Sequence, residues 1–208
     1  ISPDKVSFQD PAGPAPKIKE NKSDITVSGK NFEIVFDKKN GLIKSGIYND
    51  QRLIKGGPYF HLTGGEEIGK WVLKDIKVLK GENEAIVQIS GSNNPVEINF
   101  EVRIDGAGLV TTNYELLEFG VEAPEERKKP WNDQDAGGFQ EVGISYLLTA
   151  DINQLEWERN GLWTCYPEDH IGRNKGIAKR TLDGKEKVFG EKPERHWSLD
   201  ERDFSVYG

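Results

Sequence analysis

Strict alternation of apolar and polar residues is the feature that most constrains this chain. It is clearest over residues 96–104, where the segment VEINFEVRI has an apolar residue at every second position. Successive side chains of a β-strand point to opposite faces of the sheet, so this period predicts a strand with one buried and one solvated face. Asp105 and Gly106 follow, and their composition is typical of a turn. The segment therefore predicts a half-buried antiparallel strand.

The same pattern recurs along the chain. Residues 31–48 predict a β-hairpin, because Asn40 and Gly41 between its two halves readily adopt the positive φ angles of a tight turn. Further strands are expected at residues 72–79, 85–89, 109–117, 139–148 and 155–157. Nowhere do apolar residues recur with helical spacing over three turns without Gly or Pro. Strands at such short intervals predict an all-β fold, an antiparallel sandwich or barrel.

The ends of the chain and one long connection interrupt this pattern. Residues 1–23 contain Pro11, Pro14 and Pro16, and proline is poorly tolerated inside helices and sheets, so we expect a linker or extended segment there. Residues 24–208 are then one β-domain. Its last residues resemble an interrupted strand, so we expect the domain to be truncated at its C-terminal end. Residues 118–138 lack strand pattern and are long for a structureless loop.

Composition excludes several classes of function. Lys and Arg total 28 against 35 Asp and Glu, a net charge of -7, which argues against a nucleic-acid partner. No apolar run approaches the length of a membrane span, so no membrane partner is expected. Cys165 is the single cysteine, and the 3 histidines lack metal-ligand spacing, so we expect no disulfide, no metal site and no cofactor.

The segment of residues 163–173 combines aromatic rings with charged groups on an irregular stretch. Aromatic faces can stack on sugar rings and charged groups can bind hydroxyls, and binding sites often lie on loops. The alternative is that Trp163 and Tyr166 plug one end of the sandwich while Arg173 forms an ion pair. Trp131 is a second aromatic candidate, or else an interdomain contact. The candidate carbohydrate-binding residues are Trp163, Tyr166, Glu168, His170, Arg173 and Trp131.

The order of several segments resembles the C-terminal large β-sandwich domain of glycoside hydrolase family 2 β-galactosidases. The matching segments are residues 31–37, 41–43, 53–60, 139–144, 155–161 and 166–173. Each is weakly specific alone, and their order and spacing make the resemblance. Two features depart from it: residues 61–67 replace the family's Arg-x-Pro-Thr-Asp-Asn-Asp signature, and Glu141 stands where the family has Arg. The resemblance therefore implies a divergent member acting on another glycoside or on a polysaccharide side chain.

This resemblance implies a galactose-mutarotase-like antiparallel supersandwich. It also implies a non-catalytic, carbohydrate-contacting or supporting domain of a family 2 glycosidase, with a saccharide and the catalytic barrel and other domains of the parent enzyme as partners. The family's catalytic glutamates lie on that separate barrel, so no catalytic residue is expected here. Enzymes directed at polysaccharides commonly work outside the cytoplasm, which suggests a periplasmic or extracellular location, with the cytoplasm as the alternative.

Two other functions remain open at this point. The first is a free-standing hexose mutarotase-like enzyme, which by resemblance to the same fold would use a His as acid and a Glu as base. The second is a non-catalytic carbohydrate-binding or interaction module. A catalytic barrel encoded immediately upstream of Ile1 would decide for the glycosidase domain.

Overall fold

The structure is a computed structural model, and it describes residues 11–63, 67–122, 127–129, 132–136, 139, 141–150, 152, 154–158 and 175–179. Contacts divide the chain into two compact units, Ile1–Leu148 and Thr149–Gly208. Every regular element in the described ranges is a β-strand, and every strand pair is antiparallel. The predicted all-β antiparallel class is thereby confirmed.

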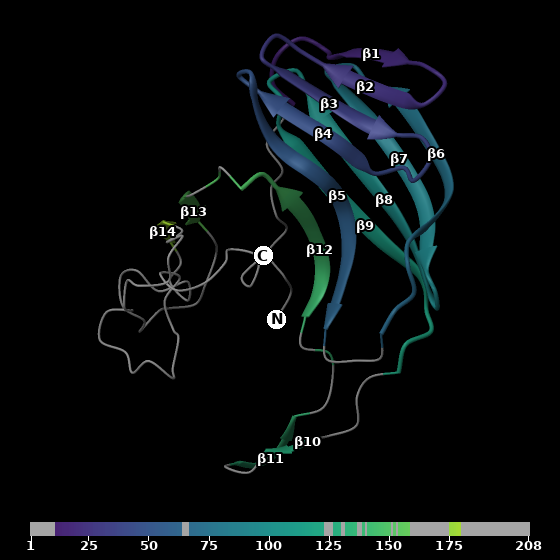
Figure 1. The fold of residues 1–208 in the computed structure, drawn as a ribbon, viewed down its shortest axis with the longest axis vertical. Helices are drawn as coiled ribbons and strands as arrows, with labels where there is room; N and C mark the ends of the chain where they lie inside the picture. The colour runs from purple at the N-terminus through teal and green to yellow at the C-terminus, as the bar shows by residue number, and fades with distance from the viewer. Residues whose placement is uncertain are drawn as a thin grey trace. The chain divides into compact units, whose positions relative to one another are not determined.

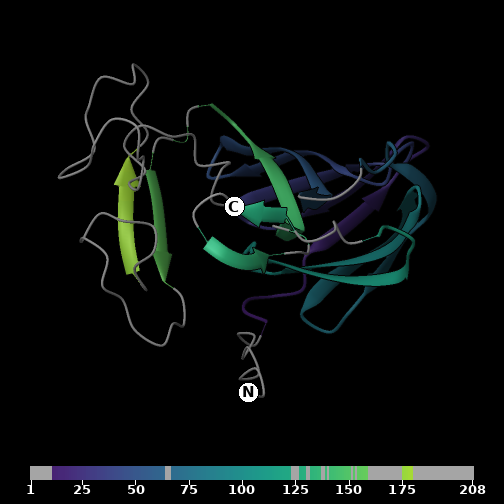
Figure 2. The same cartoon turned by 90° about the horizontal axis from the view of Figure 1, so that it is seen from below.

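The first unit contains two main sheets (Figure 1). The six-stranded sheet has the order β1 (Lys17–Glu20), β2 (Asp24–Ser28), β3 (Phe32–Asp37), β4 (Ile43–Tyr48), β5 (Gln51–Thr63) and β12 (Glu141–Leu148). The four-stranded sheet has the order β6 (Val72–Lys80), β7 (Glu84–Asn93), β8 (Val96–Asp105) and β9 (Val110–Phe119). Figure 2 shows the two sheets as two layers. A small hairpin joins β10 (Arg127–Lys129) to β11 (Asn132–Ala136).

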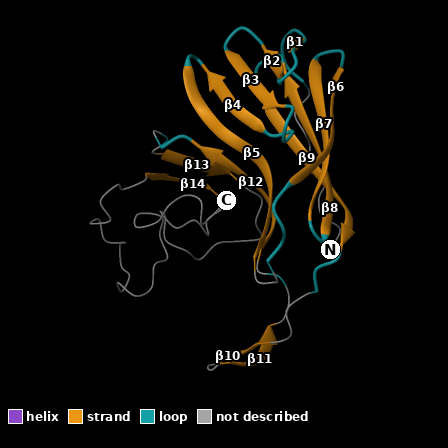
Figure 3. Cartoon of the chain, turned by 45° about the vertical axis from the view of Figure 1, so that its right-hand side comes forward, coloured by secondary structure: helices purple, strands orange, loops and turns teal. Residues whose placement is uncertain are grey.

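The second unit contains one described hairpin, in which β13 (Gln154–Glu158) pairs with β14 (Lys175–Lys179). The β13 strand covers the segment expected at residues 155–157. Figure 3 shows all described strands in one colour.

The core of the first unit lies between the two sheets. Phe36 and Ile43 from the six-stranded sheet and Ile89 and Phe100 from the four-stranded sheet are almost fully buried. They belong to one apolar cluster, and Trp71 packs against it with its ring centroid 5.6 Å from that of Phe100. Because the side-chain period is two, the residues between these buried positions point to the opposite face of each sheet, and many of them are polar. Burial of the apolar face therefore sets which face of each sheet remains accessible.

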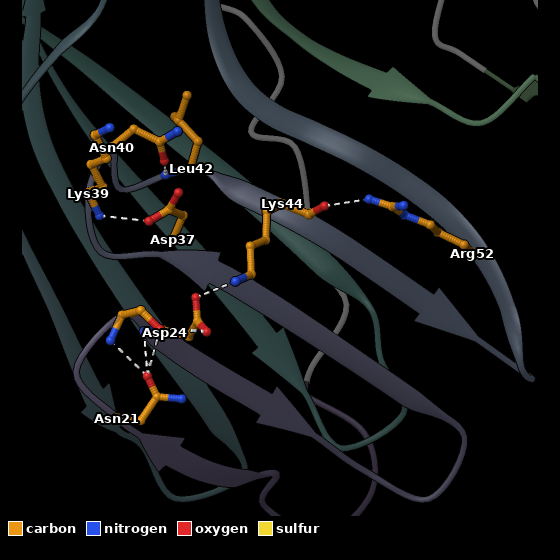
Figure 4. Close-up of polar contacts among 9 residues, drawn as sticks. Asn21, Asp24, Asp37, Lys39, Asn40, Leu42, Lys44 and Arg52 are labelled. Carbon is orange, nitrogen blue, oxygen red and sulfur yellow. Dashed lines mark hydrogen bonds and ion pairs between the residues drawn. The ribbon is translucent and has the colours of Figure 1, made fainter.

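Two turns of the six-stranded sheet are formed by residues whose backbone and side-chain preferences suit a tight turn. The β3–β4 turn has Gly41 at φ 75°, as predicted, whereas Asn40 does not have the expected positive φ and instead accepts the Leu42 N–H at 2.9 Å through its side-chain oxygen (Figure 4). Asn49 and Asp50 form the two-residue β4–β5 turn, with φ angles of 47° and 62°. Both values are typical of a type I′ turn, which Asn and Asp tolerate. Each turn fixes the register of the strands that it joins.

Most strands lie where alternation predicted them. The hairpin at residues 31–48 is β3 and β4, and the segments 72–79, 85–89, 96–104 and 109–117 are β6 to β9. The segment predicted at 139–148 is β12. The pattern did not predict β1, β5, β10, β11 and β14. In β5 the reason is visible, because Gly56, Gly57 and Pro58 interrupt the apolar period in the middle of the strand.

The N-terminal segment differs from the expected linker. Residues 17–20, placed in the linker over residues 1–23, form β1 and pair with β2. Pro16 is buried, and the Ala12 N–H donates to the Asp105 carboxylate at 2.9 Å. The prolines lie upstream of the paired residues and therefore do not interrupt the ladder.

Candidate functional site

The outer face of the four-stranded sheet has two rows of polar side chains that cross all four strands. In β8 the even-numbered residues from Val96 to Ile104 are buried, so Asn99 and Glu101 face outward. The antiparallel register aligns each of them with residues on the neighbouring strands. Directly opposite residues in a sheet share a face, so each aligned set forms one row.

The first row, here called the Glu101 row, consists of Lys77, Gln88, Glu101 and Asn113. The second row, here called the Asn99 row, consists of Asp75, Ser90, Asn99 and Glu115. Together these residues border an open groove with a volume of about 430 Å³. The groove therefore runs across β6, β7, β8 and β9.

Ion pairs and hydrogen bonds hold the Glu101 row in place. Arg103 donates from Nε to Glu101 at 2.8 Å and from Nη1 to Glu84 at 2.7 Å. Gln88 also donates to Glu101, at 3.4 Å. The hydrogen bond from Arg103 lowers the pKa of the Glu101 carboxyl, against the opposing effect of desolvation. Glu101 is consequently an ionised, oriented carboxylate at neutral pH.

The β6 end of the groove contains a close ion pair. Lys77 Nζ lies 2.6 Å from Asp75 Oδ2, on the same face of the same strand. The hydrogen bond between them lowers the pKa of Asp75 and raises the pKa of Lys77. Both side chains are exposed. Both residues are therefore charged, and because their charges are opposite the pair contributes little net charge to the groove.

The remainder of the Asn99 row has free hydrogen-bonding capacity. Within the described ranges, the side chains of Ser90, Asn99 and Glu115 form no hydrogen bond or ion pair. They offer a hydroxyl, an amide and a carboxylate, which together supply donors and acceptors. An open groove with these groups can bind a polar ligand that has many hydroxyl groups.

Trp163, Tyr166, Glu168, His170, Arg173 and Trp131 all lie outside the residues that the structure describes. Sequence reasoning did not select the groove residues, because outward-facing polar residues on a strand are typical of any solvated face. The long alternation over residues 96–104 was the only available signal. It predicts which side chains of that strand share a face, but not which residues of other strands lie beside them.

A second polar contact joins β5 to β12. His61 Nε2 lies 2.7 Å from Glu141 Oε2, and the two side chains are 42% and 53% exposed. Both residues belong to positions where the sequence departs from the glycosidase resemblance. Gly143 is the cross-strand partner of His61, and a Cβ built there would meet nothing within 4 Å. The pair therefore lies on an open part of the sheet surface.

The described residues contain no group of three or more His, Cys, Asp or Glu side chains arranged to hold a metal ion. Nor do they include a helix with the length and apolar character that a membrane crossing requires.

Comparison with protein-family models and with curated proteins finds no match to this chain.

Proposed function

We propose that the first unit binds a saccharide through the groove between the Glu101 row and the Asn99 row, as a non-catalytic carbohydrate-contacting module. The observation that supports this most directly is the alignment of amide, hydroxyl and carboxylate side chains from four strands along one open groove. Four neighbouring strands span roughly 14 Å, because adjacent strands lie about 4.8 Å apart. The groove is therefore longer than a single sugar ring.

The chemistry of the groove fits a polyol. Each sugar hydroxyl both donates and accepts hydrogen bonds, so it is best matched by groups of both kinds. Asn99 supplies both, Glu115 accepts, and the hydroxyl of Ser90 can do either. Glu101 is already oriented by Arg103 at 2.8 Å, so it need not be ordered when a ligand binds.

The resemblance to family 2 glycosidases extends this proposal to a parent enzyme. In that setting the groove would hold part of a glycan beside a catalytic barrel on another part of the protein. The role of the described unit would then be to contact and position the substrate.

The mutarotase alternative has one candidate histidine among the residues that the structure describes, His61. It requires a His and a Glu that act as separate acid and base on a bound sugar, each within reach of its own proton. His61 and Glu141 are instead bonded directly to each other at 2.7 Å. That contact leaves no room for a sugar between the two groups.

Titration of the isotope-labelled chain with neutral trisaccharides, followed by NMR, tests the proposal. We expect the amide signals of β7 to β9 beside the groove to shift on binding. Replacing Asn99 with Ala should weaken binding roughly 2- to 12-fold, because one net hydrogen bond contributes about 0.5 to 1.5 kcal/mol.

Asn83→Ala is the matched control, because Asn83 is exposed in the β6–β7 turn and does not line the groove. It should bind as tightly as the unaltered chain. Signal shifts confined to other surfaces, or an Asn99→Ala affinity equal to that of Asn83→Ala, would count against the proposal.

A further inference from the structure

The charges that line the groove do not balance. Asp75, Glu101 and Glu115 are acidic and Lys77 is the one base among the lining residues, which leaves 1 − 3 = -2. Asp75 is neutralised locally by Lys77 at 2.6 Å. Glu101 is neutralised by Arg103, although that guanidinium also binds Glu84. Glu115 is the carboxylate that lacks a cationic partner within the described part of the chain.

Neighbouring rows on the same face do not compensate for this charge. Lys74 is engaged by Glu97, one row beyond the Asn99 row. Glu118 is the cross-strand partner of Glu97 and adds a further negative charge on β9. The end of the groove formed by β9 is therefore acidic, and Glu115 lies at that end opposite Asn99.

We propose that Glu115 makes the groove selective by charge, so that it accepts neutral and amine-bearing saccharides and rejects acidic ones. This inference rests on the proposed saccharide binding and adds the class of ligand. A uronate bound against Asn99 would bring its carboxylate toward Glu115 and be repelled, while a sugar ammonium would be attracted. Glu115 thus acts as a specificity-determining residue.

The size of the effect is limited by solvent. Glu115 is exposed, so its interaction with a ligand charge resembles that of a surface ion pair. We expect each step from acidic to neutral to cationic ligand to increase affinity about two- to fivefold at low salt. The steps should shrink at high salt, because the Debye length falls from about 10 Å at 0.1 M to about 3 Å at 1 M.

Three trisaccharides of equal length provide the test: one of glucose, one of deacetylated glucosamine and one of galacturonate. NMR titration at about pH 6 keeps the sugar amine protonated and the uronate ionised. The unaltered chain should bind the amine form most tightly and the uronate most weakly. In Glu115→Gln the three affinities should converge, with the neutral ligand changing least.

Glu118→Gln is the matched control, because it removes the same charge from the same strand without altering a residue that lines the groove. It should retain the order of affinities. Equal binding of uronate and neutral ligand by the unaltered chain would overturn the charge selectivity and leave saccharide binding intact. Retained selectivity in Glu115→Gln would overturn the assignment to Glu115. Failure of all three ligands to bind would overturn the proposed function itself, and the selectivity with it.

Discussion

Thr112 and Tyr146 join the two sheets of the first unit through their side chains. The distance from Thr112 Oγ1 to Tyr146 Oη is 2.5 Å. Thr112 lies on β9, the edge of the four-stranded sheet, and Tyr146 lies on β12, the edge of the six-stranded sheet. Tyr146 also packs against the apolar cluster. This contact therefore closes one side of the sandwich, on the same strand that contributes Glu115 to the groove.

Tyr146→Phe should reduce stability modestly. The substitution keeps the ring and removes the hydrogen bond, so we expect a loss of about 0.5 to 1.5 kcal/mol in the free energy of unfolding. Thr112→Val should cost more, about 1 to 3 kcal/mol, because it leaves the half-buried phenol without its partner. Urea unfolding measures both. Tyr48→Phe, at a residue 41% exposed on β4, is the control and should change little.

The same tyrosine should make stability depend on alkaline pH. Burial raises the pKa of Tyr146 above 10.0, and the hydrogen bond with Thr112 opposes that shift. A group whose pKa is raised by folding contributes stability that is complete below its unfolded pKa and is lost as pH rises through the folded value. The chain should therefore lose stability above about pH 10, relative to Tyr146→Phe. If the urea unfolding midpoints of the two proteins changed by the same amount between about pH 9 and 11, this prediction would be wrong.

Glu101 should have the opposite dependence, on acidic pH. Its pKa is lowered from 4.5, first by the hydrogen bond from Arg103. Its contribution to stability is therefore present above pH 4.5 and is lost as pH falls through the lower folded pKa. Glu101→Gln should be less stable than the unaltered chain at neutral pH and approach it in acid. Unfolding curves across this range, with Glu33→Gln on β3 as control, test this, and a difference that does not vary with pH would contradict it.

Asp105→Asn should release the N-terminal segment selectively. Asp105 is 5% exposed; one carboxylate oxygen accepts from Ala107 and Leu109, and the other accepts from Ala12. The single oxygen of an Asn side chain can still accept from Ala107 and Leu109. In place of the second oxygen Asn has an NH₂ group, which cannot accept from Ala12. Hydrogen exchange at Ala12 should accelerate while the β8–β9 turn stays protected. Unchanged exchange at Ala12 would show that other contacts hold the segment.

The isolated chain should hydrolyse no glycoside. Glycoside hydrolysis requires a protonated carboxylic acid paired with a second carboxylate. In the groove, cationic partners lower the pKa of Asp75 and of Glu101, so neither carboxyl is held protonated at neutral pH. Incubation with a panel of nitrophenyl glycosides should give no turnover. Activity that disappears on substitution of a single Glu or Asp would refute this expectation.

Alternation along the chain was sufficient to predict most strands and the face that each buries. In β8 the same period that places Phe100 in the core places Asn99 and Glu101 on the outside. The positive φ of Gly41 in the β3–β4 turn was also predictable, because it depends on the backbone freedom of that glycine alone. The β1 strand was not predictable in this way. It forms by pairing with β2, and its own four residues have no pattern that predicts this pairing.

The candidate site depended on register, which sequence alone did not supply. Asp75 and Glu115 are far apart in the chain and lie in one row only because β7 and β8 separate them by fixed antiparallel pairings. His61 and Glu141 likewise meet because β12 pairs with β5 after a long excursion. Alternation is a local property, since each side chain's direction follows from its own backbone. Which side chains become neighbours is decided when the strands pair and the two sheets bury their apolar faces together.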